Sequence, residues 1–487
     1  MVKAAAADAG QRQPLLAAAG DATPTAAPRV SCLRRWRARS RTLLAICCLW
    51  SFAPILVLVA LAARLRHLLC GTGSSAATPR RRLRILVTGG KMSKTSAVAR
   101  AVGRSGHTVF TAEIKPYKYC HTRYCRYVSK HYVLPRPTQQ PKEWENTIKA
   151  IVDEQKIDLI IPCTAPIESS AYAHLRSSLP QNVRVFAFDG ETSDKLDNKY
   201  TFNQVLVKSS IPCPLTANME SLEDALQFFK KLERDGDQGK RFLVKPSVYD
   251  PKARTEIIFL PIPDKARQLE YLKSRNASHD VPYVIQEVLS EPEYGSYAIY
   301  NQGCLTGFEF FESASSCLVY RQLVKQYEQV RELHEKLGKA MNLTGQLTLD
   351  LMHTADGKLV PIECNPRIHS AICTLEGHQN LGRALADPDF IPEKGDVVTS
   401  KPTTYRYWFM DQVFLMLGFW APKNCFKLTL RQMARGGDAL LHGDDPMPFL
   451  AMYLVQIPSL LLLELLPGTE WLKIDFCIGK IVKEGGD

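Results

Sequence analysis

The residues best suited to chemistry lie near position 360, where Asp350 precedes the motif Glu363-Cys-Asn-Pro-Arg367 by thirteen positions. Asp350 belongs to a strand-like run, and the turn Thr354-Ala-Asp-Gly357 predicts a hairpin whose return strand brings Glu363 beside it. Side chains alternate along a strand, so Glu363, Asn365 and Arg367 share one side. Carboxylate and amide oxygens are hard ligands. We therefore expect Asp350, Glu363 and Asn365 to bind two Mg²⁺ ions, with Mn²⁺ as an alternative.

The arginine of this motif suits a different task. Arg367 can stabilise a phosphoryl group in transfer, or an acyl-phosphate-like product. The alternative interpretation is a surface hairpin with solvated acids, which the spaced Asp350 disfavours.

Two lysines fit the same chemistry. Lys245 ends the apolar run that starts at Arg241, and a cation in a half-buried strand requires an anionic partner. Lys199 follows the charged helix start Asp194-Lys-Leu-Asp-Asn. Either lysine alone is more often a solvated surface group, but together with the segment from Tyr283 to Glu293 they predict an adenosine pocket.

The next candidate segment predicts the nucleoside side of the pocket. Gln286 can meet the exocyclic amine of adenine, with Glu287 as the neighbouring hinge residue. The backbone at Val288 and Leu289 can meet the edge of the ring, and Glu293 the ribose hydroxyls. These residues predict ATP as the cofactor.

The elements before residue 190 alternate between strand and helix. Strands are expected at 83–88, 107–112 and 159–162, with helices at 96–105 and 143–155. Such alternation predicts a parallel, doubly wound sheet. Gly89-Gly90 resembles a phosphate-cradling turn, but no complete glycine-rich phosphate motif follows, so a tight strand-to-helix turn is an equal alternative and Lys91 is a weak ligand candidate.

From about Glu191 the predicted elements are mixed. We expect strands and helices at these positions: strands 241–245, 283–287, 346–352 and 359–363, and helices 222–232 and 322–341. The fold class is thus α/β followed by α+β.

Composition limits the class of protein. The 487 residues are enough for about three domains. An apolar fraction of 45% and a charged fraction of 23% exclude wholesale disorder. Much of the net charge of +13 comes from arginines before residue 85 without basic–aromatic alternation, so we expect no nucleic acid partner. The 14 cysteines form no CxxC pair, which favours reduced thiols.

An uncharged segment near the amino end predicts a membrane anchor. Leu43 to Ala63 gives 21 residues without a charge, long enough to cross a hydrocarbon core of about 30 Å. Arginines flank it on both sides, which leaves the orientation open. Because an ATP-consuming domain requires nucleotide, we place the catalytic part on the cytosolic side, through a hairpin or shallow insertion. A plastid transit sequence is the alternative for the leader.

The carboxyl end is apolar again. Residues 413–422 and 446–463 carry no charge, but Pro448 and Pro458 interrupt the second run. An interfacial segment is favoured over a buried core helix, because five aromatic residues suit a headgroup belt: Tyr405, Tyr407, Trp408, Phe419 and Trp420. The predicted domain organisation is a leader with its hydrophobic segment and linker, a Rossmann-like domain, the nucleotide-binding domain and a carboxyl-terminal region: 1–80, 84–190, 191–385 and 386–487.

Taken in chain order, the motifs of residues 84–385 resemble those of the ATP-grasp superfamily. The resemblance implies that Lys199 and Lys245 bind phosphates, that Asp350, Glu363 and Asn365 bind magnesium, and that two subdomains clamp the nucleotide. A glycine-rich lid is part of that pattern, but the segment from Ser247 to Arg254 has no glycine.

Further segments resemble a narrower family, the mycosporine-glycine synthases, and they extend to the end of the chain: 86–94, 343–350, 363–371, 445–450, 456–462 and 473–480. This resemblance implies 4-deoxygadusol and glycine as substrates. His369 and Ser370 are then the best candidates for substrate contacts, with His121, Arg123 and Tyr124 weaker ones.

Two other functions share the nucleotide residues. One is an ATP-grasp ligase that joins another carboxylate to an amine, and the other is a nucleotide-binding protein at a membrane surface without turnover. The sequence leaves open whether the protein forms a homo-oligomer.

Overall fold

The structure is a computed structural model. It describes residues 32–71, 81–164, 166–236, 239–248, 258–313, 320–393, 396–402, 404–417 and 433–483. The leader before residue 32, most of the linker after Gly71, Phe419 and Trp420, and most of the predicted lid, including Arg254, lie outside these residues.

The first sheet is parallel throughout and has the strand order β3-β2-β1-β4-β5. Its strands are β1 (Arg84–Thr88), β2 (Thr108–Ile114), β3 (Val128–Leu134), β4 (Leu159–Pro162) and β5 (Arg184–Val185). The prediction of a doubly wound sheet is therefore confirmed. The strands β3 and β5 were not predicted, because Val128–Leu134 is half exposed and Arg184–Val185 has two residues.

Helices cover both faces of this sheet. They are α4 (Ser93–Arg104), α5 (Pro141–Gln155), α6 (Pro166–Leu175) and the short turns η1 (Lys115–Tyr117), η2 (His121–Tyr124) and η3 (Arg176–Ser178). Alternate residues of β1 face opposite sides: Ile85 and Val87 pack in the core with Val98 of α4, whereas Leu86 packs in the core with Ile148 of α5. Burial on both faces explains the continuous apolar runs of these strands.

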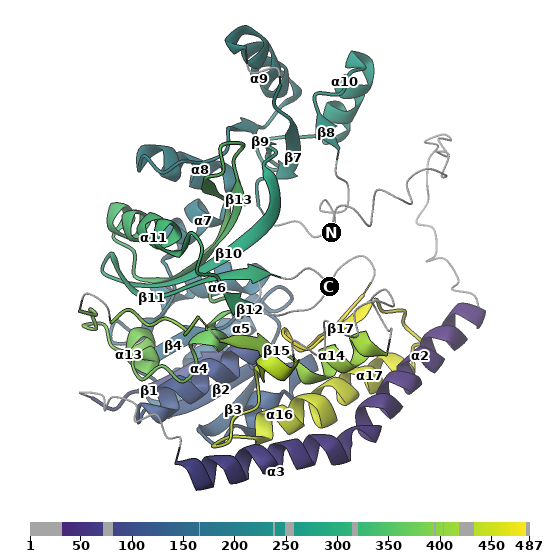
Figure 1. Ribbon diagram of the computed structural model, residues 1–487, viewed down its shortest axis with the longest axis vertical. Helices are drawn as coiled ribbons and strands as arrows, with labels where there is room; N and C mark the ends of the chain where they lie inside the picture. Colours follow the sequence, from purple (N-terminus) through teal and green to yellow (C-terminus); the bar gives the residue numbers. More distant parts are fainter. Residues whose placement is uncertain are drawn as a thin grey trace.

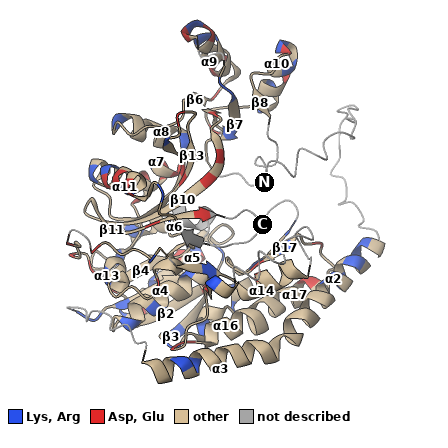
Figure 2. Cartoon of the chain, in the orientation of Figure 1, with Lys and Arg blue, Asp and Glu red and all other residues tan. Residues whose placement is uncertain are grey.

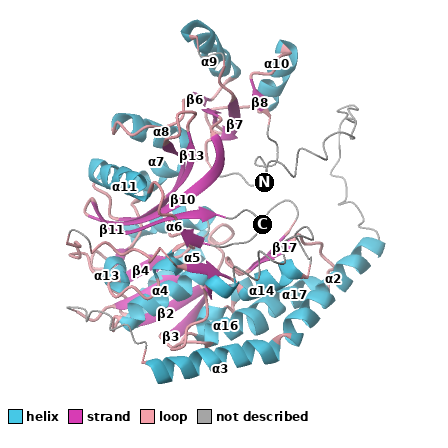
Figure 3. Ribbon diagram, viewed as in Figure 1, coloured by secondary structure: helices cyan, strands magenta, loops and turns pink. Residues whose placement is uncertain are grey.

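A small antiparallel sheet forms the upper part of the molecule in Figure 3. Its order is β6-β9-β7-β8, with β6 (Thr216–Met219), β7 (Phe242–Pro246), β8 (Phe259–Leu260) and β9 (Tyr283–Glu287). The helices α9 (Leu222–Asp235) and α10 (Lys265–Ser274) pack on it around Phe242. A capping box between Ser221 and Asp224 begins α9.

The second large sheet has the order β14-β13-β10-β11-β12-β15-β16. Its strands are β10 (Ser290–Asn301), β11 (Cys304–Ser313), β12 (Tyr320–Gln322), β13 (Gly345–His353), β14 (Leu359–Asn365), β15 (Tyr405–Tyr407) and β16 (Gly437–Asp438). The helices around it are α7 (Gly190–Asp197), α8 (Lys199–Lys208), α11 (Tyr327–Met341), α12 (Ile372–Leu375), α13 (Leu381–Ala386) and α14 (Phe409–Met416). Since β15 and β16 extend this sheet, the chain beyond residue 386 contributes to the same sheet as the segment before it.

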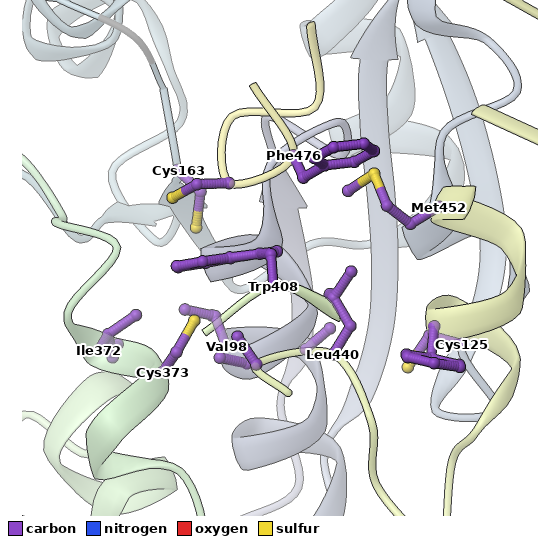
Figure 4. Close-up of a cluster of buried hydrophobic side chains, with 14 of the residues drawn as sticks. Val98, Cys125, Cys163, Ile372, Cys373, Trp408, Leu440, Met452 and Phe476 are labelled. Atoms are coloured by element: carbon purple, nitrogen blue, oxygen red, sulfur yellow. The ribbon is translucent and has the colours of Figure 1, made fainter. Parts of the chain in front are cut away.

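The carboxyl-terminal segment packs against the first sheet. It comprises α16 (Met447–Ala451), the π-helical turn η5 (Met452–Gln456), α17 (Ile457–Leu465), β17 (Lys473–Asp475) and β18 (Lys480–Val482). Figure 4 shows Trp408 within the shared core, near Cys163, Met452 and Phe476. The Trp408 indole N–H donates to Ser93 Oγ at 2.7 Å. Tyr407 and Trp408 are buried, so their expected place in a headgroup belt is wrong.

Two described helices are long and apolar enough to cross a membrane: Cys32–Cys70 with 39 residues and Met447–Leu465 with 19. The first consists of α2 (Cys32–Ser51) and α3 (Ala53–Cys70), which run along one edge of the molecule in Figure 1. The second is more than half buried, and its exposed residues are Met447 at its start and Leu462 and Leu463 near its end.

Candidate active site

The two strands predicted to carry the acidic residues pair as expected. Asp350 of β13 lies directly opposite Glu363 of β14 in the antiparallel register, and a register shift follows immediately at Leu351. The predicted hairpin therefore exists, and it places the two carboxylates on neighbouring strands. Because the turn is short and local, the sequence alone was sufficient to predict this pairing.

Asn365 and Arg367 join the acidic pair. The Asn365 Nδ2 amide donates to Asp350 Oδ2 at 3.2 Å, and Arg367 Nη2 donates to Asn365 Oδ1. The amide oxygen thus faces Arg367 in this structure, and it must turn from Arg367 to reach a cation between the carboxylates.

A cation from a neighbouring helix completes the cluster. Lys199 begins α8, whose amino end is capped by the Asn198 side chain, and its Nζ lies 3.4 Å from Glu363 Oε2. Both side chains are mostly buried, with 11% and 17% of their surface exposed. The geometry therefore joins the predicted phosphate-binding lysine to the predicted metal ligand.

Arg367 has a partner that the sequence did not predict. Its Nη1 lies 3.6 Å from Asp197 Oδ1, and it is buried without a hydrogen bond to a described residue. Burial raises the pKa of Asp197, while Arg367 opposes that rise. Asp197 is the last residue of α7, so the charged run predicted to start a helix instead ends one, and α8 begins directly after it. That charged run was the available signal for Asp197.

Lys245 and Gln286 lie side by side on the small sheet. Lys245 Nζ donates to Gln286 Oε1 at 3.1 Å, and Gln286 Nε2 donates to the Ile362 carbonyl of β14 at 3.1 Å. The second bond connects the small sheet to the large one, next to Glu363. Both ends of the Gln286 amide are thus bonded to protein, so its predicted contact to adenine requires the amide to exchange a partner.

The remaining nucleoside candidates lie at the end of β9. The Val288 N–H donates to the Arg241 carbonyl at 2.8 Å, and Glu287 Oε2 accepts from the Leu215 N–H at 3.0 Å. Leu289 is half-buried and Glu293 is exposed on β10. Four of the five predicted residues are consecutive, from Gln286 to Leu289, whereas Glu293 lies four positions further along on β10. Their role stays a prediction.

His369 lies just beyond the metal motif and is half-buried. Its ring stacks on Phe311 with the centroids 5.0 Å apart, and its Nδ1 accepts from the Ala371 N–H. Burial, aided by Lys94 and Arg367, lowers the pKa of His369 to about 3, so the imidazole is neutral near pH 7. Lys94, which had no assigned role, donates from Nζ to the Thr164 and Ile368 carbonyls at 2.9 Å each.

The other residues considered for substrate contact lie elsewhere. The His121 N–H and ring bond to Gln456 Oε1 of the carboxyl-terminal segment, and Arg123 is exposed. The turn at Gly89 is tight: its φ is +77°, and an added Cβ would lie 1.9 Å from the Cys163 carbonyl oxygen. Lys91 is buried with its Nζ over the Tyr117 ring, so the strand-to-helix turn is the better description.

The donor set fits magnesium better than a transition metal. Among the described residues no group of three or more His, Cys, Asp or Glu side chains could hold a metal ion. The cluster provides two carboxylates and one amide, and Mg²⁺ is commonly held by one or two carboxylates, with phosphates and water as its other ligands. A hollow of about 630 Å³ between α6 and α7 contains none of these donors, and we locate the site by its chemistry instead.

Comparisons with known proteins agree on the fold. No protein-family model matches the sequence, and no curated protein matches it. Biotin carboxylase from Campylobacter jejuni, solved in a complex with ATP, superposes with a TM-score of 0.51 and 12% identity, over 65% of this chain and 74% of that one. The biotin carboxylase domain of 2-oxoglutarate carboxylase from Hydrogenobacter thermophilus is a dimer solved with MgADP, ADP and bicarbonate. It superposes with a TM-score of 0.51 and 14% identity, over 66% of this chain and 73% of that one. The chain therefore has the ATP-grasp fold, preceded by a Rossmann-like domain, as predicted.

Proposed function

We propose that this chain is an ATP-dependent, Mg²⁺-requiring ligase that forms a C–N bond and releases ADP and phosphate. One observation carries the proposal: cationic and acidic side chains from three elements meet where the two antiparallel sheets join. These side chains are Lys199, Asp350, Glu363, Asn365 and Arg367. The ATP-grasp fold supports the same activity, because the similar solved structures were obtained with ATP or MgADP bound.

Each group has a task in this proposal. Asp350, Glu363 and Asn365 would hold Mg²⁺, which when bound offsets the negative charge of the terminal phosphates. Lys199 would then exchange Glu363 for a phosphate oxygen, and Lys245 would exchange Gln286 in the same way. Arg367, with a buried Nη1 that makes no hydrogen bond to a described residue, would face the transferring phosphoryl group.

The second substrate would bind at the carboxyl edge of the first sheet. In a doubly wound sheet, ligands bind outside the carboxyl ends of the strands at the point where the strand order reverses, which here is between β1 and β4. Thr164 follows β4 at this edge and lines a small cavity together with Arg367 and Ile368. The cavity therefore connects the phosphoryl end of the site with the switch point.

We assign 4-deoxygadusol and glycine as substrates, supported by the motifs similar to mycosporine-glycine synthases. The enolic oxygen of 4-deoxygadusol would attack the γ-phosphorus, lose its proton and release ADP. The glycine amine would then add to the carbon that carries this oxygen. The bond between that carbon and the oxygen would break with loss of phosphate, and the nitrogen would lose a proton to give an enaminone. Neutral His369 could accept or donate a hydrogen bond but would carry no charge.

The location that fits this activity is a membrane surface with the nucleotide site in the cytosol. The support is the long apolar helix Cys32–Cys70 together with the requirement for ATP. A plastid membrane is the alternative location.

The activity is tested with the full-length chain in detergent micelles, supplied with ATP, Mg²⁺, 4-deoxygadusol and glycine. We expect phosphate release that depends on both substrates, together with a new ultraviolet-absorbing product. Phosphate release with a carboxylate and an amine, but not with 4-deoxygadusol and glycine, would point to an ATP-grasp ligase with other substrates. Binding of ATP without phosphate release under any of these conditions would contradict a ligase.

A further inference from the structure

The long amino-terminal helix is attached to the rest of the protein along its whole length. Its buried residues are Ala38, Thr42, Ala45, Ile46, Leu49, Leu56 and Ala60, and apart from Ile46, which adjoins Ala45, they recur every three, four or seven positions. This spacing forms a single stripe that continues from α2 into α3 through the bend at Phe52. The stripe packs in the same core as α17 and the first sheet. The helix is thus a fixed part of the body and not an extension from it.

Hydrogen bonds hold the helix to the body near both of its ends. Near one end, Arg41 Nη2 donates to the Leu472 carbonyl at 2.7 Å, and the Trp471 indole N–H donates to Thr42 Oγ1 at 3.0 Å. Near the other end, Arg64 Nη1 donates to the Gly443 carbonyl at 3.3 Å. A Cβ added to Gly443 would lie 2.5 Å from the Ala63 carbonyl oxygen, so the backbones are in close contact there.

This attachment is incompatible with a helix that crosses a membrane. If α2 and α3 crossed the hydrocarbon core, the segments packed against them would have to enter it as well. Asp444, directly after Gly443, is paired with Arg104 at 2.9 Å and accepts from Tyr127. Charged side chains at the centre of a bilayer are expensive, so such a group would resist insertion.

The opposite face of the helix is apolar and exposed. At about 100° per residue, the positions opposite the buried stripe include Leu43, Leu44, Trp50, Leu58, Leu61 and Leu65. These six side chains are between 49% and 65% exposed. Leu462 and Leu463 of α17, which packs against α2, and Leu466 directly after α17 are also exposed. Soluble proteins rarely expose a continuous apolar surface of this length, so this face is a binding surface.

Basic side chains stand at the two ends of this face. No charged residue lies between Arg41 and Arg64, whereas Arg37 and Arg39 precede this interval and Arg66 follows it. Figure 2 shows the same distribution, with basic residues at the outer ends of α2 and α3 and none between. An apolar centre with arginine flanks complements the acyl chains and anionic headgroups of a lipid surface.

We propose that α2 and α3 lie in the plane of an anionic membrane surface, with the apolar face in the acyl boundary, and do not span the bilayer. This inference rests on the membrane location proposed above and specifies its geometry and its lipid. It implies that both ends of the helix, and the nucleotide site, remain on the same side of the membrane. Figure 1 agrees, since the rest of the described chain lies to one side of these helices.

The orientation is tested by synthesis of the full chain in the presence of microsomes, with one N-glycosylation acceptor added before Met1. The native acceptor at Asn276, which is exposed, reports on the body once the second native acceptor is removed by Asn342→Gln. An in-plane helix predicts that the two sites share one state, both glycosylated or both unmodified. Glycosylation of only one of the two would show that the helix spans the membrane and would overturn the proposal.

The lipid surface is tested by flotation of the full-length chain with vesicles of phosphatidylcholine, with and without phosphatidylserine. We expect stronger binding to the anionic vesicles, and a loss of about tenfold in binding for Leu58→Glu/Leu61→Glu. The matched control Val281→Glu/Val324→Glu adds the same charges at exposed valines away from this face, and its binding should be unchanged.

Each other outcome counts against one part of the proposal. Equal binding to neutral vesicles would remove the anionic partner. Absence of all vesicle binding would remove the membrane location itself, whatever the glycosylation result. A dimer that the Leu58→Glu/Leu61→Glu pair dissociates, without vesicle binding, would assign the face to a second copy of the chain. Retained thermal unfolding midpoints would show that the variants are folded.

Discussion

Two charged clusters in this molecule use the same residue types but differ in their pairing. The first lies between α4 and the carboxyl-terminal segment. Arg100 donates to both carboxylate oxygens of Glu376, and Arg104 donates to both oxygens of Asp444 at 2.9 Å. The side chains of Arg100 and Glu376 are fully buried. Burial alone would raise the pKa of Glu376, but Arg100 and His442 hold it well below its usual value.

The second cluster is the candidate site, and it is less deeply buried. Lys199 Nζ lies 3.4 Å from Glu363 Oε2, and both side chains retain some exposure. Arg367 Nη1 is buried without a hydrogen bond to a described residue. Buried charges are stable only when they are well paired, so incomplete pairing close to solvent leaves donors that an anionic ligand can satisfy. We infer that the first cluster stabilises the fold and that the second serves binding.

Removal of a charge from the structural cluster should have the largest effect on stability. Glu376→Gln leaves Arg100 buried without its anionic partner, and we expect a loss of about 3–5 kcal/mol in the free energy of unfolding. Denaturant unfolding measures it. The control Glu335→Gln removes an exposed partner of Arg331 and should change stability by less than about 1 kcal/mol. Equal effects of the two variants would refute the assignment of the first cluster as structural.

The corresponding change in the site should act on turnover instead. Glu363→Gln keeps the size of the side chain but removes a charge from the predicted metal site, so phosphate release should fall by about 100- to 1,000-fold. The unfolding midpoint should stay close to that of the parent. Glu328→Gln, on the exposed face of α11, is the control for the same chemical change. A variant that retains full activity would remove Glu363 from the metal site.

Acid should destabilise both regions through a half-buried histidine in each. Burial lowers the pKa of His369 to about 3, and burial also lowers the pKa of His442 to about 4. Below about pH 6.5 the unfolded chain therefore binds more protons than the folded chain, and stability falls as the pH decreases. Each such histidine contributes about 1.4 kcal/mol per pH unit across that window. Unfolding midpoints measured from pH 7 to 5 test this, and a midpoint that rises on acidification would contradict it.

Loss of one phosphate contact should have the smallest effect. Lys199→Met removes the ammonium but keeps the aliphatic stem, and we expect a loss of about tenfold in kcat/KM for ATP. A steady-state titration of ATP measures this change. The control is Lys336→Met, because Lys336 Nζ donates to the Ser210 carbonyl on the surface. It separates the effect of losing a cation in the site from the effect of losing any lysine. Equal rates for both variants would show that Lys199 does not touch the nucleotide.

Local patterns were sufficient to predict several individual strands and the hairpin that carries the acidic residues. The strands at 159–162 and 283–287 have the predicted bounds, and the Asp350–Glu363 pairing follows from one short turn. Register within a hairpin depends on residues close in sequence, which explains this success. The ATP-grasp fold was predicted from the resemblance of its motifs, and the membrane-compatible length of the amino-terminal helix from its uncharged run.

Only the tertiary structure decided which distant groups meet. The contacts of Arg367 with Asp197 and of Gln286 with Ile362 join segments 170 and 76 positions apart. Burial of Trp408 against Ser93, and the attachment of Arg41 to Trp471, link the two ends of the chain. Such contacts depend on how whole elements pack, and packing is not encoded in the pattern of any single segment. The sequence by itself determined which residues could do the chemistry, and the packing of the sheets determined which of them stand together.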